Sequence, residues 1–221
     1  MNATAILPVK RFSRAKTRLL GDLIGPQERA ALLRAMLTDV MAAIERSAAI
    51  ERVVVVTAEG RAEKLAMEAA KRMGTPIEVL QDPGDPGHSE AATLGIVRAK
   101  ALGADCVALL PGDCPLLDPG EVDAALARMA PGRVAVVPDR HGTGTNGVLM
   151  APPDAIGPAF GPDSCERHLD RAGRAGWTAV REDLSSLALD LDTPADLDLL
   201  RERLGRDPEA APATAGVVAT L

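Results

Sequence analysis

Short apolar runs alternate with amphipathic stretches along most of this chain of 221 residues. The clearest run covers residues 52–57 and holds four consecutive valines. A short run rich in β-branched residues favours a buried strand, and the stretches between such runs place apolar residues at helical spacing. Strands that alternate with helices predict an α/β fold, with a mostly parallel central sheet covered by helices on both faces.

The pattern also gives approximate boundaries. The expected strands cover residues 3–9, 52–57, 77–80, 106–110 and 134–137, and the expected helices cover 26–46, 59–73, 89–102 and 118–129. Residues 187–191 are strand-like, and further helices begin near Cys165 and after Thr193, which precedes a proline as helix N-caps often do. We expect one domain over residues 1–206 and a flexible C-terminal tail over 207–221, where Pro, Ala, Thr and Gly prevail.

Charge and composition exclude several classes of protein. The net charge of -6 argues against binding of a long nucleic acid, which needs a broad basic face. Because the sequence has no apolar run near 18 residues, we expect no membrane span. The three cysteines, Cys106, Cys114 and Cys165, lack the spacing of a zinc site and indicate reduced thiols, and hence a cytoplasmic protein.

Basic residues gather directly after the first expected strand. Five cations fall within nine residues, and they are Lys10, Arg11, Arg14, Lys16 and Arg18. In an acidic protein this concentration predicts a local site for a compact polyanion such as a nucleoside triphosphate. The alternative is a solvated basic loop, since charge runs are usually surface features.

Three aspartates are candidate magnesium ligands. Asp113 lies in a proline-flanked turn after an expected strand, and Asp190 and Asp192 are two residues apart in an extended segment, which places them on one side of the chain. Mg²⁺ usually takes one or two carboxylates and completes its shell with substrate phosphates and water. The structural alternatives are a turn aspartate for Asp113, and solvent and a helix entry for the pair.

Two loops could bind phosphate. Residues 142–145 are rich in glycine and hydroxyl groups, and Ser164 follows Gly161 at the start of an expected helix, where N–H groups can meet an anion. A plain hairpin turn explains the first loop equally well, and a capping box of Asp163 with Glu166 explains the second. The three histidines have no metal-ligand spacing, and the sequence offers no candidate for covalent catalysis.

Six motifs in order resemble one family. They are Leu7-Pro8-Val9-Lys10, Ala15-Lys16-Thr17-Arg18-Leu19, Pro111-Gly112-Asp113-Cys114-Pro115, residues 139–146, Phe160-Gly161-Pro162-Asp163-Ser164 with His168, and residues 190–197. Together they are similar to the guanylyltransferases of coenzyme F-420 biosynthesis, which act on 2-phospho-L-lactate, phosphoenolpyruvate or 3-phospho-D-glycerate. The resemblance implies a single nucleotidyltransferase domain of the glycosyltransferase-A-like, Rossmann-like type, with a mixed, mostly parallel sheet.

The same resemblance implies roles for individual residues. Lys16, with Lys10 and Arg18, receives the phosphates of GTP, the co-substrate. Asp113, Asp190 and Asp192 bind Mg²⁺, with two ions expected, and Lys16 and Asp113 are the catalytic residues. The phosphorylated three-carbon acid meets Thr145, Gly161 and Ser164. Family members can pair as homodimers, so the resemblance allows a homodimer and the sequence leaves the oligomeric state open.

One position departs from the family pattern. Many members carry a Leu-Asn pair before the helix near residue 89, where this chain has Gly87-His88-Ser89-Glu90. We expect Ser89 to take over a nucleotide contact. A phosphomonoester is largely dianionic near neutral pH, so it can attack GTP without a general base once cations remove the repulsion between the two anions.

Three other functions remain open at this point. A sugar or cofactor nucleotidyltransferase usually begins with a Gly-x-Gly-Thr loop, where this chain has Leu7-Pro8-Val9-Lys10. A glycosyltransferase normally carries Asp-x-Asp in mid-chain, where this chain has the lone Asp113. A nucleotide-sensing protein would bind without turnover. Which phospho-acid is the substrate depends on pocket shape, which the sequence does not give.

Overall fold

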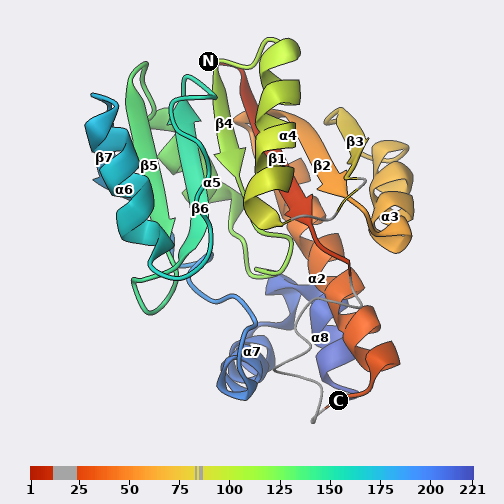
Figure 1. The fold of residues 1–221 in the computed structure, drawn as a ribbon. Coiled ribbons are helices and arrows are strands. Elements are labelled where there is room, and N and C mark those ends of the chain that lie inside the picture. The colour runs from red at the N-terminus through yellow and green to blue at the C-terminus, as the bar shows by residue number, and fades with distance from the viewer. Residues whose placement is uncertain (12–23, 83, 85–86) are drawn as a thin grey trace.

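A computed structural model describes residues 1–11, 24–82, 84 and 87–221 of the chain. In this described part, seven strands form one sheet between two layers of helices (Figure 1). The strands are β1 (Ala3–Val9), β2 (Ile50–Thr57), β3 (Ile77–Gln81), β4 (Cys106–Leu109), β5 (Arg133–Pro138), β6 (Thr145–Ala151) and β7 (Thr178–Arg181). The helices are α2 (Pro26–Glu45), α3 (Gly60–Ala70), α4 (His88–Ala101), α5 (Pro119–Ala127), α6 (Ser164–Arg174), α7 (Pro194–Arg206) and α8 (Pro212–Val218).

The sheet is mixed, with the strand order β3-β2-β1-β4-β6-β5-β7. Strand β6 pairs antiparallel with both β4 and β5, whereas the other pairings among the described strands are parallel. Thus the expected α/β fold with a mixed, mostly parallel sheet is confirmed. Strands β6 and β7 were not expected from the sequence, and β6 begins at the edge of the sheet where the parallel strands end.

The valine run of β2 shows how the sheet separates two cores. Val53 and Val55 belong to the core beneath α2, α3 and α5, and Val54 and Val56 belong to the core beneath α4 and α6. Successive side chains of a strand point to opposite faces, so a strand buried on both sides is apolar throughout. Aliphatic residues fill both cores, as the shortage of aromatic residues requires.

Helix α4 lies unusually close to the sheet. A Cβ at Gly95 would fall 2.3 Å from a side-chain carbon of Ile6, so a larger residue could not pack there without a shift of helix or strand. This contact packs the middle of α4 directly against the middle of β1.

The C-terminal segment differs from the flexible tail expected over residues 207–221. It forms a short 3-10 turn, η1 (Pro208–Ala210), and then α8, which packs against α2. Ala211 and Thr214 are fully buried, and the Asp39 carboxylate of α2 accepts hydrogen bonds from the backbone N–H groups of Ala213 and Thr214. Small residues here pack closely against α2, a tertiary effect that composition alone does not reveal.

The strand-like interpretation of residues 187–191 was also wrong. These residues form a turn and an irregular segment, in which Asp192 N–H donates to the carbonyl of Asp190. Leu187, Leu189 and Leu191 are nevertheless buried, so every second side chain does face the core. The segment therefore alternates buried and more exposed side chains as a strand would, but no strand of the described sheet pairs with it.

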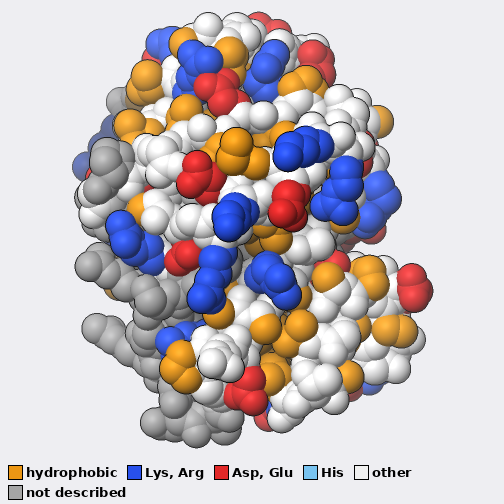
Figure 2. All heavy atoms as spheres, turned by 90° about the vertical axis from the view of Figure 1, so that its right-hand side faces the viewer, with side chains coloured by type: hydrophobic (Ala, Val, Ile, Leu, Met, Phe, Trp, Pro, Cys, Tyr) orange, Lys and Arg blue, Asp and Glu red, His pale blue; other side chains and the backbone are white. Residues whose placement is uncertain are grey.

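The β3 edge of the sheet is lined by charge. Lys and Arg side chains gather over this end of the molecule with acidic side chains among them (Figure 2), and Arg98 pairs with Glu78 of β3 at 2.7 Å. Charged side chains at an edge strand discourage pairing with another chain. None of the helices in the described ranges is long and apolar enough to cross a membrane.

Candidate active site

A cleft of about 810 Å³ opens where the parallel strands end. Its walls come from the segments after β1, β4 and β5, from the start of β6, and from the first turns of α4 and α6. In α/β sheets this edge is where ligands usually bind. The described site residues expected from the sequence all line this one cleft, and they are Lys10, Ser89, Asp113, Thr145, Gly161, Ser164, Asp190 and Asp192.

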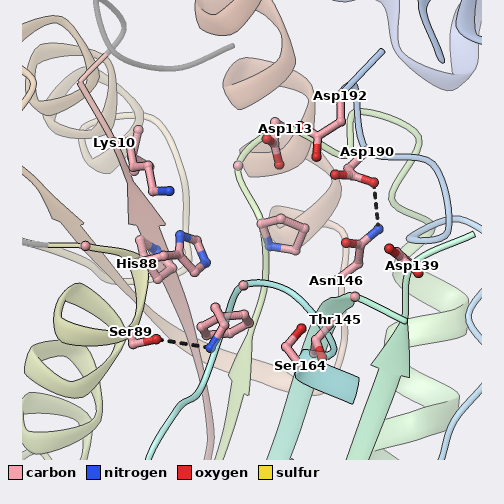
Figure 3. Close-up of a pocket in the computed structure, with 18 of the residues that line it drawn as sticks. Lys10, His88, Ser89, Asp113, Asp139, Thr145, Asn146, Ser164, Asp190 and Asp192 are labelled. Carbon is pink, nitrogen blue, oxygen red and sulfur yellow. Dashed lines mark hydrogen bonds between the residues drawn. The ribbon is translucent and has the colours of Figure 1, made fainter. Parts of the chain in front are cut away.

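Two expected site residues cannot be placed. Lys16 and Arg18 fall within residues 12–23, outside the described residues. Lys10, directly after β1, is exposed and lines the cleft. Figure 3 shows it across the cleft from the three aspartates, so a cation and three carboxylates face the same space.

The acidic side of the cleft is held by hydrogen bonds to the backbone. Asn146 is the second residue of β6. Its side-chain amide donates to the carbonyl of Leu187 at 2.7 Å and to Asp190 Oδ1 at 3.3 Å (Figure 3). Asn146 is 8% exposed, so this amide lies largely out of water. It therefore fixes both the turn that precedes Asp190 and the carboxylate itself.

A second anchor holds Asp192. The buried carboxylate of Asp196 accepts from the backbone N–H of Asp192 at 3.0 Å and from both donors of Thr193, which caps α7 as expected. Its other oxygen lies 2.7 Å from the guanidinium of Arg140, and Arg140 N–H donates to the carbonyl of Ala188. The loop after β5 is thus tied to the acidic segment before α7.

The loop of residues 139–144 is a tight connection between β5 and β6. Asp139 Oδ1 accepts from the N–H groups of His141 and Thr143, both at 3.1 Å, and Gly142 N–H donates to the Asp139 carbonyl. Because these amides are already bonded within the turn, the hairpin explanation is confirmed for them. The cleft is lined in this region by Asp139, Thr143 and Gly144 of the loop and by Thr145 and Asn146 at the start of β6.

The other candidate phosphate-binding loop lies at the start of α6. Gly161 has a φ of 113°, a conformation that favours glycine, and it turns the chain into the helix. Ser164 and Cys165 donate their N–H groups to the carbonyls of Gly161 and Thr143. Asp163 makes no side-chain cap, so the proposed capping box is not formed. With these amides occupied, we expect side-chain hydroxyls to contribute strongly to anion binding here.

Ser89 holds the opposite wall in place. Its hydroxyl accepts from the backbone N–H of Phe160 at 3.0 Å, which links the first turn of α4 to the segment before α6 (Figure 3). The Phe160 ring packs edge-on against the rings of His88 and His168, with centroids 4.5 and 5.2 Å apart. One of the two phenylalanines in the chain therefore lies in the cleft wall.

His168, quoted in the sequence only as part of a motif, is buried behind this wall and contacts its residues. Burial, and then the nearby Arg171 and Arg167, lower the pKa of its imidazole from 6.5 to about 4, against a raising effect of the Ser164 carbonyl. The ring is therefore neutral at physiological pH. Its signal in the sequence is weak, because one histidine on a helix has no characteristic spacing.

The carboxylate groups of Asp113, Asp190 and Asp192 are of the chemical type that binds magnesium. Among the residues whose positions are described, no group of three or more His, Cys, Asp or Glu is close enough to hold a metal by itself. Carboxylate oxygens are nonetheless the donors that Mg²⁺ prefers, and it commonly uses one or two of them with substrate phosphates. Asp113, Asp190 and Asp192 therefore fit an ion that a nucleotide completes.

Comparison with protein families identifies the chain. The model of the family "Guanylyl transferase CofC like" matches residues 3–202. The chain belongs to this family. It is 44% identical to a phosphoenolpyruvate guanylyltransferase of Conexibacter woesei, over 100% of this chain and 97% of the relative. A protein of the same name from Sphaerobacter thermophilus is 38% identical over 90% of this chain and 93% of its own.

Solved structures support the nucleotidyltransferase fold. A nucleotide-diphospho-sugar transferase candidate from Desulfovibrio desulfuricans G20 superposes with a TM-score of 0.74 at 20% identity, covering 100% of this chain and 98% of its own. A nucleotidyl transferase from Methanothermobacter superposes with a TM-score of 0.66 at 16% identity, over 93% of this chain and 98% of its own. This family member thus has a fold found among enzymes that handle nucleotides.

Proposed function

We propose that the protein transfers GMP from GTP to phosphoenolpyruvate and releases pyrophosphate. The observation that carries this proposal is the 44% identity over the full chain to a phosphoenolpyruvate guanylyltransferase. The cleft supports it, because it brings Lys10, the three candidate magnesium ligands and hydroxyl groups together in one space of about 810 Å³. The other phospho-acids expected from the resemblance, 2-phospho-L-lactate and 3-phospho-D-glycerate, are the alternatives within the same chemistry.

The reaction needs positioning rather than a nucleophile from the protein. A phosphate oxygen of phosphoenolpyruvate attacks the α-phosphorus of GTP, the bond from that phosphorus to the bridging oxygen of the β-phosphate breaks, and pyrophosphate leaves with the electron pair. The product is a phosphoanhydride that joins GMP to the acid. Since the attacking phosphate is largely dianionic near neutral pH, the residues must orient and neutralise two anions.

Each side of the cleft has a part in this proposal. Lys10, with Lys16 and Arg18 from outside the described residues, would contact the triphosphate, and Thr145, Gly161 and Ser164 would hold the acid. Ser89, through its bond to Phe160, would shape the wall that receives the nucleotide. Asp113, Asp190 and Asp192 would hold two Mg²⁺ ions, which neutralise phosphate charge and stabilise the leaving pyrophosphate when bound.

A substrate panel tests the proposal. Purified protein with Mg²⁺ is mixed with GTP, ATP or CTP and with phosphoenolpyruvate, 2-phospho-L-lactate, 3-phospho-D-glycerate or a sugar phosphate, and pyrophosphate is measured. We expect release with GTP and phosphoenolpyruvate. Release with a sugar phosphate in place of the acids would instead show a sugar nucleotidyltransferase, and binding of GTP without release would show a nucleotide sensor.

Asp113→Asn tests the acidic side directly. The substitution keeps the size of the side chain and removes its charge, so we expect pyrophosphate release to stop while circular dichroism and the melting temperature stay close to those of the wild type. Asp183→Asn is a matched control, because Asp183 is exposed and does not line the cleft. A near-normal rate in Asp113→Asn would contradict the assigned role of Asp113.

A further inference from the structure

His168 contacts two parts of the cleft wall from a fully buried position in α6. Its Nε2 lies 2.8 Å from the backbone nitrogen of Ala159, and its Nδ1 lies 3.1 Å from the hydroxyl oxygen of Thr145. Thr145 begins β6, and Ala159 lies in the segment that leads to Gly161. One ring thus touches both segments that are expected to hold the phospho-acid.

The contact with Ala159 determines which ring nitrogen carries the proton. A backbone N–H can only donate, so Nε2 must accept and cannot carry hydrogen. In a neutral imidazole the proton then resides on Nδ1. This nitrogen faces the Thr145 hydroxyl, and the Ser164 carbonyl, which can only accept, shares its hydrogen.

The state of Nδ1 in turn orients the Thr145 hydroxyl. A protonated Nδ1 has no lone pair to accept a hydrogen bond, so the Thr145 oxygen can only accept from it. The hydroxyl's own hydrogen must then point away from the ring. Thr145 lines the cleft and is only half-buried, so the cleft is the direction in which a partner for this hydrogen can bind.

We propose that His168 is a positioning residue that makes the Thr145 hydroxyl a hydrogen-bond donor to the phospho-acid substrate. This inference rests on the proposed function for the identity of the substrate, whose phosphate and carboxylate groups are acceptors. A hydroxyl beside a histidine of the other tautomer would donate to the ring and present only lone pairs to the cleft. Such a group would repel an anion, whereas a preoriented donor attracts it.

The contact of His168 with Ala159 holds the segment that leads to Gly161, on the other side of the expected phospho-acid site. Arg167, the preceding residue of α6, donates to the carbonyls of Ala159 and Phe160 at 2.8 and 3.4 Å, while His168 accepts from the N–H of Ala159. Both polar groups of Ala159 are therefore bonded to consecutive residues of one helix. The Phe160 ring lies against His168 and its N–H bonds to Ser89, so displacement of the imidazole would also disturb the path to Gly161.

The tautomer can be measured without any activity. We expect ¹⁵N NMR of the histidine side chains at neutral pH to show one neutral ring with hydrogen on Nδ1 and an unprotonated Nε2, and that signal should be missing in His168→Gln. A protonated Nε2, or a doubly protonated ring, would overturn the inference whether or not the protein turns over phosphoenolpyruvate.

Kinetics of a double-mutant cycle test the effect on substrate. His168→Gln places an amide oxygen where it can still accept from Ala159 N–H, but it removes the donor next to Thr145. We expect the KM for phosphoenolpyruvate to rise about tenfold, in line with the loss of a hydrogen bond to a charged group, while the KM for GTP stays unchanged. In a Thr145→Val background, which already lacks the hydroxyl, the same His168 substitution should change the KM little further.

The cycle separates the possible outcomes. Asp170→Asn, an exposed change on the same helix, should leave both KM values as they are. Equal rises in the two KM values, or independent effects of the His168 and Thr145 substitutions, would show that His168 acts only in packing and would overturn the inference. If the wild type released no pyrophosphate with phosphoenolpyruvate, the proposed function would fail, and the NMR result would still decide the orientation of Thr145.

Discussion

Polar side chains around the cleft bond mostly to the backbone. Asp139 and Asp196 each accept from two backbone N–H groups, Asn146 donates to a backbone carbonyl, and His168 accepts from a backbone N–H. A side chain that satisfies a fixed backbone group is held in one rotamer and in turn holds the loop in place. At the scale of single residues, the site is therefore built before any substrate arrives.

The buried imidazole of His168 predicts a pH-dependent stability. In the unfolded chain this group has a pKa near 6.5, whereas in the folded protein burial and two arginines lower it to about 4. Between these values the unfolded state binds more protons, so the free energy of unfolding falls as the pH falls from 6.5 to 4. At 1.36 kcal/mol per pKa unit, the full loss is about 3 kcal/mol.

Urea unfolding at pH 7 and at pH 4.5 measures this effect. We expect the wild type to lose more stability than His168→Gln across this range, because the variant lacks the titrating ring. Arg167 and Arg171, on the helix that carries His168, are common to both proteins. Parallel loss of stability in the two proteins would show that His168 does not titrate as its surroundings indicate.

The sequence indicated individual site residues better than their supports. Asp113, Thr145 and Ser164 were chosen from motifs and line the cleft, because strand ends and helix starts can be recognised locally. Asn146, Asp196 and His168 act through partners between 4 and 44 residues away in the chain. The pairings of Asn146 and His168 join segments that are distant in the chain, so no local pattern could have shown them, whereas Asp196 lies in the helix start that the sequence did predict.

At the scale of elements, the segment before α7 depends on β6 for its position. Asn146→Ala removes the amide that bonds the Leu187 carbonyl and Asp190, and we expect kcat to fall about tenfold because the Asp190 carboxylate loses its fixed orientation. The free energy of unfolding should fall by about 1–3 kcal/mol for the buried carbonyl that loses this donor.

Steady-state kinetics with GTP and phosphoenolpyruvate, together with urea unfolding, check both effects. Asp183→Asn, in the exposed part of the chain just before this segment, serves as the control and should change neither quantity. An unaltered kcat in Asn146→Ala would mean that Asp190 keeps its position through other contacts or takes no part in the reaction.

Helix α8 is a second element whose position depends on one buried carboxylate. Asp39→Ala removes the acceptor for the N–H groups of Ala213 and Thr214 and leaves them without this partner in a buried place. We expect the free energy of unfolding to fall by about 1–3 kcal/mol, as is typical when buried donors lose their acceptor. Glu209→Gln, an exposed acidic residue of η1, is the control for loss of charge.

Unfolding in urea, followed by circular dichroism, gives this measurement. A stability equal to that of the wild type would indicate that α8 docks through its apolar contacts alone, such as that of Val218 with the core. The sequence could not predict this docking, because Ala, Pro and Gly are also typical of loose tails. Asp39 itself gave no signal, since its partners lie 174 and 175 residues away.

At the scale of the whole molecule, the local pattern of apolar runs predicts strands but does not predict their order in the sheet. Alternating runs predicted most parallel strands, and β2 and α2 begin or end within two residues of their expected bounds. The place of β6 between β4 and β5 follows from pairing of segments that are distant in sequence. That placement brings Thr145 and Asn146 to the edge where Asp113 lies, so the long-range topology assembles the site.

The whole molecule is also acidic, with a net charge of -6, although its proposed substrates are anions. Binding of GTP must therefore overcome general repulsion, and the acids of the cleft add to it unless a cation lies between them and the phosphates. We expect GTP to stabilise the protein strongly with Mg²⁺ present and weakly in EDTA. At GTP concentrations a hundredfold above Kd, the gain is about 2.7 kcal/mol, or about 5–10 °C in Tm for a chain of this size.

Thermal unfolding followed by circular dichroism measures this effect, with protein alone, with GTP, and with GTP and Mg²⁺. EDTA should leave the Tm of the protein alone unchanged, because the core is made of apolar side chains. Asp113→Asn should lose most of the increase that depends on Mg²⁺, whereas Asp183→Asn should keep it. Equal stabilisation by GTP in Mg²⁺ and in EDTA would show that the three aspartates do not bind the nucleotide through a metal, and would leave the basic residues after β1 as its main contacts.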